Sequence, residues 1–160
     1  MSVYFEIGNL LDAPVDYICH QVNCQGRMRS GIAKQIRERW PVVYEEYEKL
    51  HRQYLVKGSV TYLHGQSQVV PINDHQSVIN MFAQLFYGYD GKRYTSYDAF
   101  WACLGEITEV VPKGSKIGFP AKIGCGLGGA NWEVIFRMIK EVLGDEYEVY
   151  IYMLEEEMHG

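Results

Sequence analysis

The stretch ICHQVNCQG, residues 18–26, changes from buried to exposed character within a few positions. Ile18, Cys19 and Val22 suit a strand that is packed on both faces of a parallel sheet. Polar side chains and a glycine follow at its end. The pattern predicts a central strand over residues 17–22 whose carboxyl end leads into a functional loop.

Length and composition set the frame around this strand. The chain has 160 residues, 48% hydrophobic and 22% charged, which is typical of one globular domain with one core. We expect a single domain over residues 1–160 with a short acidic tail at about 155–160. The net charge of −5 argues against general nucleic-acid binding, which needs a dense Lys and Arg surface. Four cysteines without a CxxC pair, no signal peptide and no apolar run of ~20 residues predict a reduced, cytoplasmic protein without a membrane segment.

Strand and helix patterns alternate along the chain, which predicts an α/β fold with helices on both faces of a sheet. The expected strands cover residues 3–7, 17–22, 59–63, 69–72, 78–86, 116–120 and 147–154. Apolar residues at helical spacing predict helices over 31–40 and 41–54, a third that begins at a capping box of Thr95 and Asp98, and a fourth from Asn131 to Gly144.

Two glycine-containing segments follow predicted strands, where ligands bind in such sheets. The first is NCQGRMRSGIAKQI, residues 23–36, and the second is FPAKIGCGLGGANW, residues 119–132. Glycines there indicate positive φ angles or close approach of the backbone to a ligand, and free backbone N–H groups could face a phosphate. Either segment alone is equally well explained as a turn. The cysteine and histidine spacings favour neither a cysteine phosphatase nor a metal site.

The motifs together carry a family resemblance. The order GNLL (8–11), HQVNCQG (20–26), SGIA (30–33), IGCGLGG (123–129) and NW (131–132) resembles a macro domain, and within that superfamily the small phage, bacterial and yeast-type proteins that process ADP-ribose 1″-phosphate. The resemblance covers nearly the whole chain. It implies a three-layer α/β/α sandwich around a mixed, mostly parallel sheet of about six to seven strands. It also implies an ADP-ribose cleft at the end of the sheet, no metal or cofactor, and a cytoplasmic location, in the host cytoplasm if a phage encodes the protein.

The resemblance assigns binding roles to matching positions. Asn9 and Leu10 match the adenine-binding stretch, with Asn9 replacing an aspartate, and Asn23 matches an asparagine that contacts the distal ribose, although it could simply complete a turn. Arg29 and its neighbour Arg27 could hold a terminal phosphate or remain solvated. The two phosphate loops and the cleft lining correspond to Gly26, Met28, Ser30, Gly31 and Ile32, to Ile123, Gly124, Cys125, Gly126, Leu127 and Gly128, and to Phe119 and Pro120.

The resemblance also suggests chemistry at the first loop. His20 matches a histidine proposed as catalytic in the yeast-type phosphatases, where it could act as a general acid or base while Asn23 orients water. The alternative is a histidine that is satisfied inside the sheet. Related ADP-ribosyl hydrolases use a lysine where Gln84 or a neighbour stands here, and an aspartate where Gly128 stands.

Three functions therefore remain open. The first is hydrolysis of the terminal phosphate of ADP-ribose 1″-phosphate, and the second is binding of ADP-ribose or an ADP-ribosyl group without turnover. The third is removal of ADP-ribose from a modified protein or nucleic acid. A His20 side chain that faces the cleft favours chemistry, and one buried in the sheet favours binding.

Overall fold

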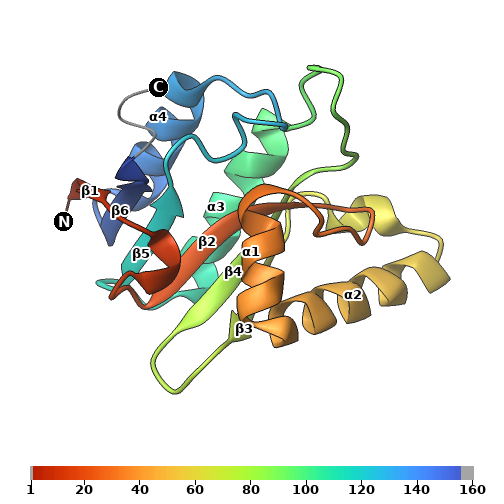
Figure 1. Ribbon diagram of the computed structural model, residues 1–160, viewed down its shortest axis with the longest axis horizontal. Coiled ribbons are helices and arrows are strands. Elements are labelled where there is room, and N and C mark those ends of the chain that lie inside the picture. Colours follow the sequence, from red (N-terminus) through yellow and green to blue (C-terminus); the bar gives the residue numbers. More distant parts are fainter. Residues whose placement is uncertain (1, 156–160) are drawn as a thin grey trace.

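A computed structural model describes residues 2–155 and shows one central sheet between two layers of helices (Figure 1). The sheet has six strands in the order β1-β6-β5-β2-β4-β3. Strand β3 is antiparallel to β4, and the other adjacent pairs are parallel. The strands are β1 (Val3–Ile7), β2 (Tyr17–Asn23), β3 (Ser67–Pro71), β4 (Ser77–Gln84), β5 (Lys116–Pro120) and β6 (Glu148–Met153). The predicted mixed, mostly parallel sheet is confirmed, whereas most of the predicted acidic tail, residues 156–160, lies outside the described residues.

Two helices cover each face of the sheet. The helices are α1 (Gly31–Arg39), α2 (Pro41–Val56), α3 (Tyr97–Val110) and α4 (Trp132–Leu143). Pro41 occupies the first turn of α2, where a missing N–H costs nothing. Asn131 caps α4 through a 2.9 Å bond from Glu133 N to its Oδ1, as the sequence predicts.

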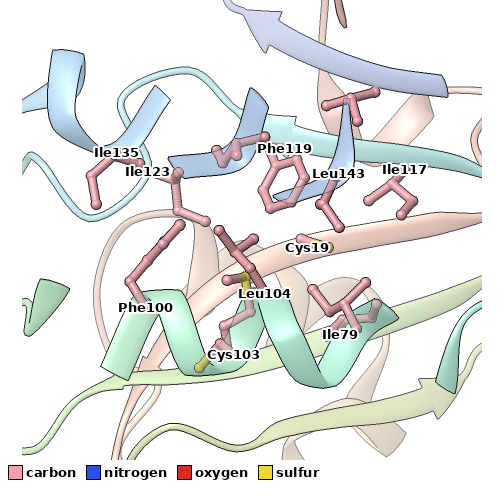
Figure 2. Packing of buried hydrophobic residues seen from close by; sticks show 14 of the residues in the cluster. Cys19, Ile79, Phe100, Cys103, Leu104, Ile117, Phe119, Ile123, Ile135 and Leu143 are labelled. Atoms are coloured by element: carbon pink, nitrogen blue, oxygen red, sulfur yellow. The ribbon is translucent and has the colours of Figure 1, made fainter. Parts of the chain in front are cut away.

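Strand β2 separates two apolar clusters because its side chains alternate between the faces. Cys19 packs with β4, β5, α3 and α4, and Figure 2 shows Leu104 and Leu143 close to it. Ile18 and Val22 pack on the other face with α1 and α2. The buried strand of the opening motif is therefore the centre of the fold.

Two predicted elements differ from the structure. Residues 59–63, predicted as a strand, include the 3₁₀-helix η2 (Val60–Leu63), in which Leu63 is buried while Tyr62 is 72% exposed. The backbone of this segment is satisfied locally, because Tyr62 N donates to Ser59 O at 3.0 Å and His64 N donates to Thr61 O at 3.2 Å. The cap of α3 is Ser96, one residue after the predicted Thr95, and its Oγ accepts a bond from Ala99 N. Within residues 2–155, no helix has the length and apolarity needed to cross a lipid bilayer.

Candidate functional site

A pocket opens at the carboxyl ends of β2 and β4, between the two predicted glycine segments and the loop that precedes α3. In an open parallel sheet this edge is the expected place for a ligand. The pocket is lined by Gln21, Val22, Asn23, Arg27, Arg29, Ser30, Ala33, Gln84, Tyr87, Gly88, Tyr89 and Leu127. The structure therefore brings together Asn23, Arg29, Ser30 and Leu127 from the sequence-predicted site.

The first loop, residues 24–30, is organised by Asn23. Its Oδ1 accepts a bond from Gln25 N at 3.0 Å, and its Nδ2 donates to Arg27 O at 2.9 Å. The Tyr47 hydroxyl, which comes from α2, lies 2.7 Å from Asn23 O and accepts a bond from Arg27 N at 3.0 Å. Asn23 thus forms the turn that the sequence allows, and the same hydrogen bonds hold its side chain at the wall of the pocket.

The same loop places positive charge beside the start of α1. Ser30 is the N-cap residue of α1 but makes no side-chain cap bond, because its Oγ lies 2.6 Å from the Tyr89 hydroxyl. The first N–H groups of α1 are therefore left without a side-chain cap, which favours an anion. Arg27 and Arg29 are exposed at this position, and within residues 2–155 neither forms an ion pair with a carboxylate.

Different structural constraints favour glycine at different positions of the second loop, residues 121–130. Gly124 and Gly129 have φ angles of +76° and +73°, which disfavour residues with a Cβ. A Cβ on Gly128 would lie 2.5 Å from the Gly124 carbonyl oxygen and would also overlap the Thr95 hydroxyl, whereas a Cβ on Gly126 has nothing within 4 Å. Both predicted reasons for glycine therefore occur in this loop. Gly124 and Gly129 have positive φ angles, and the backbone at Gly128 closely approaches other atoms of the protein.

An amide and hydroxyl network joins the floor of the pocket to this loop. Gln21 Nε2 donates to Gln84 Oε1 and to Thr95 Oγ1, both at 2.7 Å. The Thr95 hydroxyl donates to Gly124 O at 2.8 Å. We name Gln21, Gln84 and Thr95 the floor network. The prediction omitted Gln21 and Thr95 from the site, because their meeting depends on contacts between distant parts of the chain.

His20 lies away from the pocket, which corrects the catalytic prediction. It is 0% exposed and faces α1 and α2, and its Nε2 lies 2.5 Å from Asn80 Oδ1. Burial lowers the pKa of His20 to about 4, while the bond with Asn80 opposes part of that shift. A neutral, enclosed imidazole at this position cannot exchange protons with a molecule in the pocket.

Several residues that the sequence predicts as ligand contacts have side chains in the core. Leu10, Met28, Phe119 and Ile123 are at most 4% exposed, and Figure 2 shows Phe119 and Ile123 among the packed side chains between the sheet, α3 and α4. Burial of apolar area explains their positions, since an apolar residue in a site motif can serve the core as well as a ligand. Asn9 is exposed and caps the 3₁₀-helix η1 (Leu10–Asp12) through a 2.9 Å bond from Leu11 N. The remaining predicted residues do not line the pocket: Gly26, Gly31, Ile32, Pro120, Gly124, Cys125, Gly126 and Gly128.

The residues that line the pocket are of few chemical types. Among the described residues, those that line the pocket include no histidine, carboxylate, lysine or cysteine. Within residues 2–155, no group of three or more His, Cys, Asp or Glu residues is placed so that it could hold a metal ion. The pocket can therefore offer cations, amides, hydroxyls and backbone N–H groups.

Comparison with known proteins identifies the architecture. No protein-family model matches the chain. A curated relative, the DNA ADP-ribosyl glycohydrolase of Thermus aquaticus, is 25% identical over 150 residues, which cover 92% of this chain and 40% of the relative. The chain therefore spans well under half the length of that protein.

Solved structures agree over almost the whole chain. A protein of unknown function from Bacteroides thetaiotaomicron has a TM-score of 0.81 at 26% identity, covering 96% of this chain and 99% of that one. The macrodomain of Thermus aquaticus DarG has a TM-score of 0.74 at 25% identity, covering 94% and 97%. Thermosipho africanus DarTG, solved in complex with ADP-ribose, has a TM-score of 0.73 at 19% identity, covering 96% and 42%. The chain has the macro domain fold.

Proposed function

We propose that this macro domain binds ADP-ribose or an ADP-ribosyl group, with a phosphate seated between the first loop, the start of α1 and the second glycine loop. The observation that carries the proposal is the meeting of Arg27, Arg29 and the uncapped start of α1 in one pocket that contains no carboxylate. Charge-assisted bonds and helix N-termini both favour phosphate oxygens. Thermosipho africanus DarTG, part of which has a similar fold, was solved in complex with ADP-ribose, which supports the choice of ligand.

The two arginines favour a ligand with a further phosphate. Arg27 and Arg29 line the same pocket as Asn23, beside which we place the distal ribose. A guanidinium group can bind a terminal phosphate through two parallel bonds. We therefore expect ADP-ribose 1″-phosphate to bind more tightly than ADP-ribose.

Binding without rapid turnover is the favoured activity. His20 is enclosed in the sheet, and the described pocket lining has no group that titrates near neutral pH. Gln84 or a neighbour also stands near the place where the resemblance to ADP-ribosyl hydrolases implies a lysine. These placements weaken the phosphatase hypothesis that the sequence favours.

Hydrolysis of an ADP-ribosyl linkage is the second candidate. The similarity to a DNA ADP-ribosyl glycohydrolase over 92% of this chain favours it. Asn23 and Gln84 could orient a water molecule there, and the backbone N–H groups of the loops could stabilise developing negative charge. Such a reaction would rest on positioning and electrostatics.

Titration calorimetry with ADP-ribose and ADP-ribose 1″-phosphate tests the proposal, alongside assays of phosphate release and of ADP-ribose release from modified DNA and protein. We expect binding of both ligands and an approximately tenfold advantage for the phosphorylated one, as one charge-assisted bond provides. Arg29→Ala should remove that advantage, whereas the control Arg52→Ala, on the exposed surface of α2, should retain it. Absence of binding of both ligands by the wild-type protein would overturn the proposal. Turnover that is fast relative to ligand release would make the protein an enzyme.

A further inference from the structure

Strand β1 forms an open edge of the sheet, separated by β6 and β5 from the strands that carry the pocket (Figure 1). Gly8 N donates to Met153 O at 2.9 Å, and backbone bonding alternates along a parallel pair, so the even-numbered residues of β1 bond to β6. The N–H and C=O groups of Val3, Phe5 and Ile7 therefore point away from the sheet. Within residues 2–155 these groups have no backbone partner.

The opposite edge of the sheet, β3, is protected against pairing. Pro71 has no N–H to offer, and Ser67 N donates to the Glu106 side chain at 2.9 Å. Proline, lysine and side-chain cover are common means of blocking an edge strand. Strand β1 contains no proline, lysine or arginine, and its one charged residue is Glu6. The two edges therefore differ, and β1 is free to pair with another strand.

The side chains of β1 are open to solvent on both faces of the sheet. Phe5 and Ile7 are 60% and 59% exposed on the face that carries α4, where the Phe5 ring lies 5.4 Å from the Phe136 ring. Tyr4 is 43% exposed on the other face and stacks on Tyr150. Exposed aromatic and aliphatic side chains along an unpaired edge are typical of a surface that contacts another chain.

We propose that two copies of this chain pair through β1 in antiparallel orientation, about a twofold axis at Phe5, so that their sheets join. This register places Phe5 opposite Phe5 of the second copy and Val3 opposite its Ile7, and the outward backbone groups of these residues then bond in pairs. The face that carries α4 thus becomes a continuous apolar row. On the other face Tyr4 lies opposite Glu6 of the second copy.

Charge and length favour this register over its neighbours. A twofold axis at Glu6 would place two carboxylates directly opposite each other, which is unfavourable. An axis at Tyr4 would leave Ile7 opposite no residue of β1. Only the axis at Phe5 pairs all five residues of the strand and also keeps the carboxylates apart. The β1 sequence is therefore complementary to itself in one register.

The exposed area fits a weak dimer. The open parts of Tyr4, Phe5 and Ile7 offer about 300 Å² per copy, since a fully covered aromatic side chain buries about 150–250 Å². The outward backbone and the edge of α4 add to this area. Stable complexes bury about 800 Å² per partner. We therefore expect an equilibrium between monomer and dimer in the micromolar range, and it should not require a ligand in the pocket.

Sedimentation equilibrium of the full chain across the micromolar range tests the proposal. The mass of the wild type should rise from that of one chain to that of two. Ile7→Lys introduces a positive charge at each end of the paired strands and removes apolar contact, so it should weaken dimerisation at least about tenfold. The matched control Val56→Lys, at an 88% exposed position at the end of α2, should dimerise like the wild type. Circular dichroism and thermal unfolding establish that each variant is folded.

Cysteine crosslinking tests the register without a charged substitution. Phe5→Cys places two thiols opposite each other across the axis, whereas the thiols of Ile7→Cys are offset by about 13 Å along the strands. A short bis-maleimide should therefore join copies of Phe5→Cys and leave copies of Ile7→Cys separate. The wild type, treated in parallel, accounts for the partly exposed Cys125.

The outcomes decide the proposal without reference to ADP-ribose. Loss of the dimer in Ile7→Lys, its retention in Val56→Lys and crosslinking through position 5 would support it. A wild type that remains monomeric at every concentration would overturn it. A dimer that persists unchanged in Ile7→Lys, or crosslinking that favours Ile7→Cys, would show that the copies meet through another surface or register and would also overturn it.

Discussion

Two polar networks begin at neighbouring residues of β2 and end in different environments. His20 bonds to Asn80, Asn80 Nδ2 donates to Gln68 Oε1 at 3.0 Å, and Gln68 Nε2 donates to the carbonyl of Glu46 in α2 at 2.9 Å. Gln21 instead enters the floor network and reaches the pocket. Successive strand residues face opposite sides of a sheet, so adjacent polar residues can serve the interior and the site. A polar side chain at the end of a buried strand is therefore insufficient evidence of catalysis.

The His20 network is closed because it ends on a backbone oxygen that can only accept. The Glu46 carbonyl orients Gln68, Gln68 orients Asn80, and Asn80 then requires a proton on His20 Nε2. His20 Nδ1 is left buried without a partner. A second proton on the ring would place an unpaired charge in this interior, which explains the lowered pKa of His20.

The largest predicted effect is a pH dependence of stability caused by His20. The pKa of His20 is about 4 in the folded protein and 6.5 as its ordinary value, so the unfolded chain binds a proton first as the pH falls. The contribution of neutral His20 to the free energy of unfolding is fully present above pH 6.5. About 3 kcal/mol of this free energy is lost as the pH falls from 6.5 to 4. Urea unfolding measured from pH 7.5 to 4.5 should show a steep decline for the wild type.

The matched variants isolate this contribution. His20→Gln keeps a donor for Asn80 but does not titrate, so its stability should fall less steeply over the same range. Burial also lowers the pKa values of His51 and His64, and their shared contribution remains in both proteins. His75→Gln, at an exposed position outside both networks, controls for the removal of a histidine as such. Equal slopes for wild type and His20→Gln would show that the two networks do not differ in the way proposed.

A smaller effect is expected where the floor network meets the second glycine loop. Gly128→Ala places a Cβ against the Thr95 hydroxyl and 2.5 Å from the Gly124 carbonyl oxygen, so backbone must move. Overpacking of this kind costs about 2 kcal/mol and should weaken ADP-ribose binding. The control Gly126→Ala meets nothing within 4 Å and should be neutral or slightly stabilising. Thermal unfolding of both variants checks the contrast, and equal destabilisation would refute the steric explanation.

The sequence predicts the sheet, four helices and the location of both glycine loops, because these follow from local periodicity and turn chemistry. It does not predict which face of β2 carries the site. The alternation shows that His20 and Gln21 point in opposite directions, but the contact of Gln21 with Thr95 joins residues 74 positions apart. That contact depends on tertiary packing, which periodicity does not encode.

The apolar residues that the motifs predict as ligand contacts show the importance of side-chain direction in a related way. Phe119 and Met28 belong to the two apolar clusters on opposite faces of the sheet. An apolar residue before a glycine loop is compatible with a cleft wall and with the core. Side-chain direction decides between them, and only the folded structure provides it.

The smallest predicted effect concerns a bond that lies outside both networks. The Tyr89 hydroxyl lies 2.6 Å from Ser30 Oγ across the mouth of the pocket, and Tyr89 is 67% exposed. Water competes for exposed groups, so Tyr89→Phe and Ser30→Ala should each change the free energy of unfolding by less than about 0.5 kcal/mol. In a double-mutant cycle their coupling should also be within about 0.5 kcal/mol. A coupling larger than this would contradict the expectation and would mean that the Ser30–Tyr89 bond holds the mouth of the pocket as firmly as the floor network holds its base.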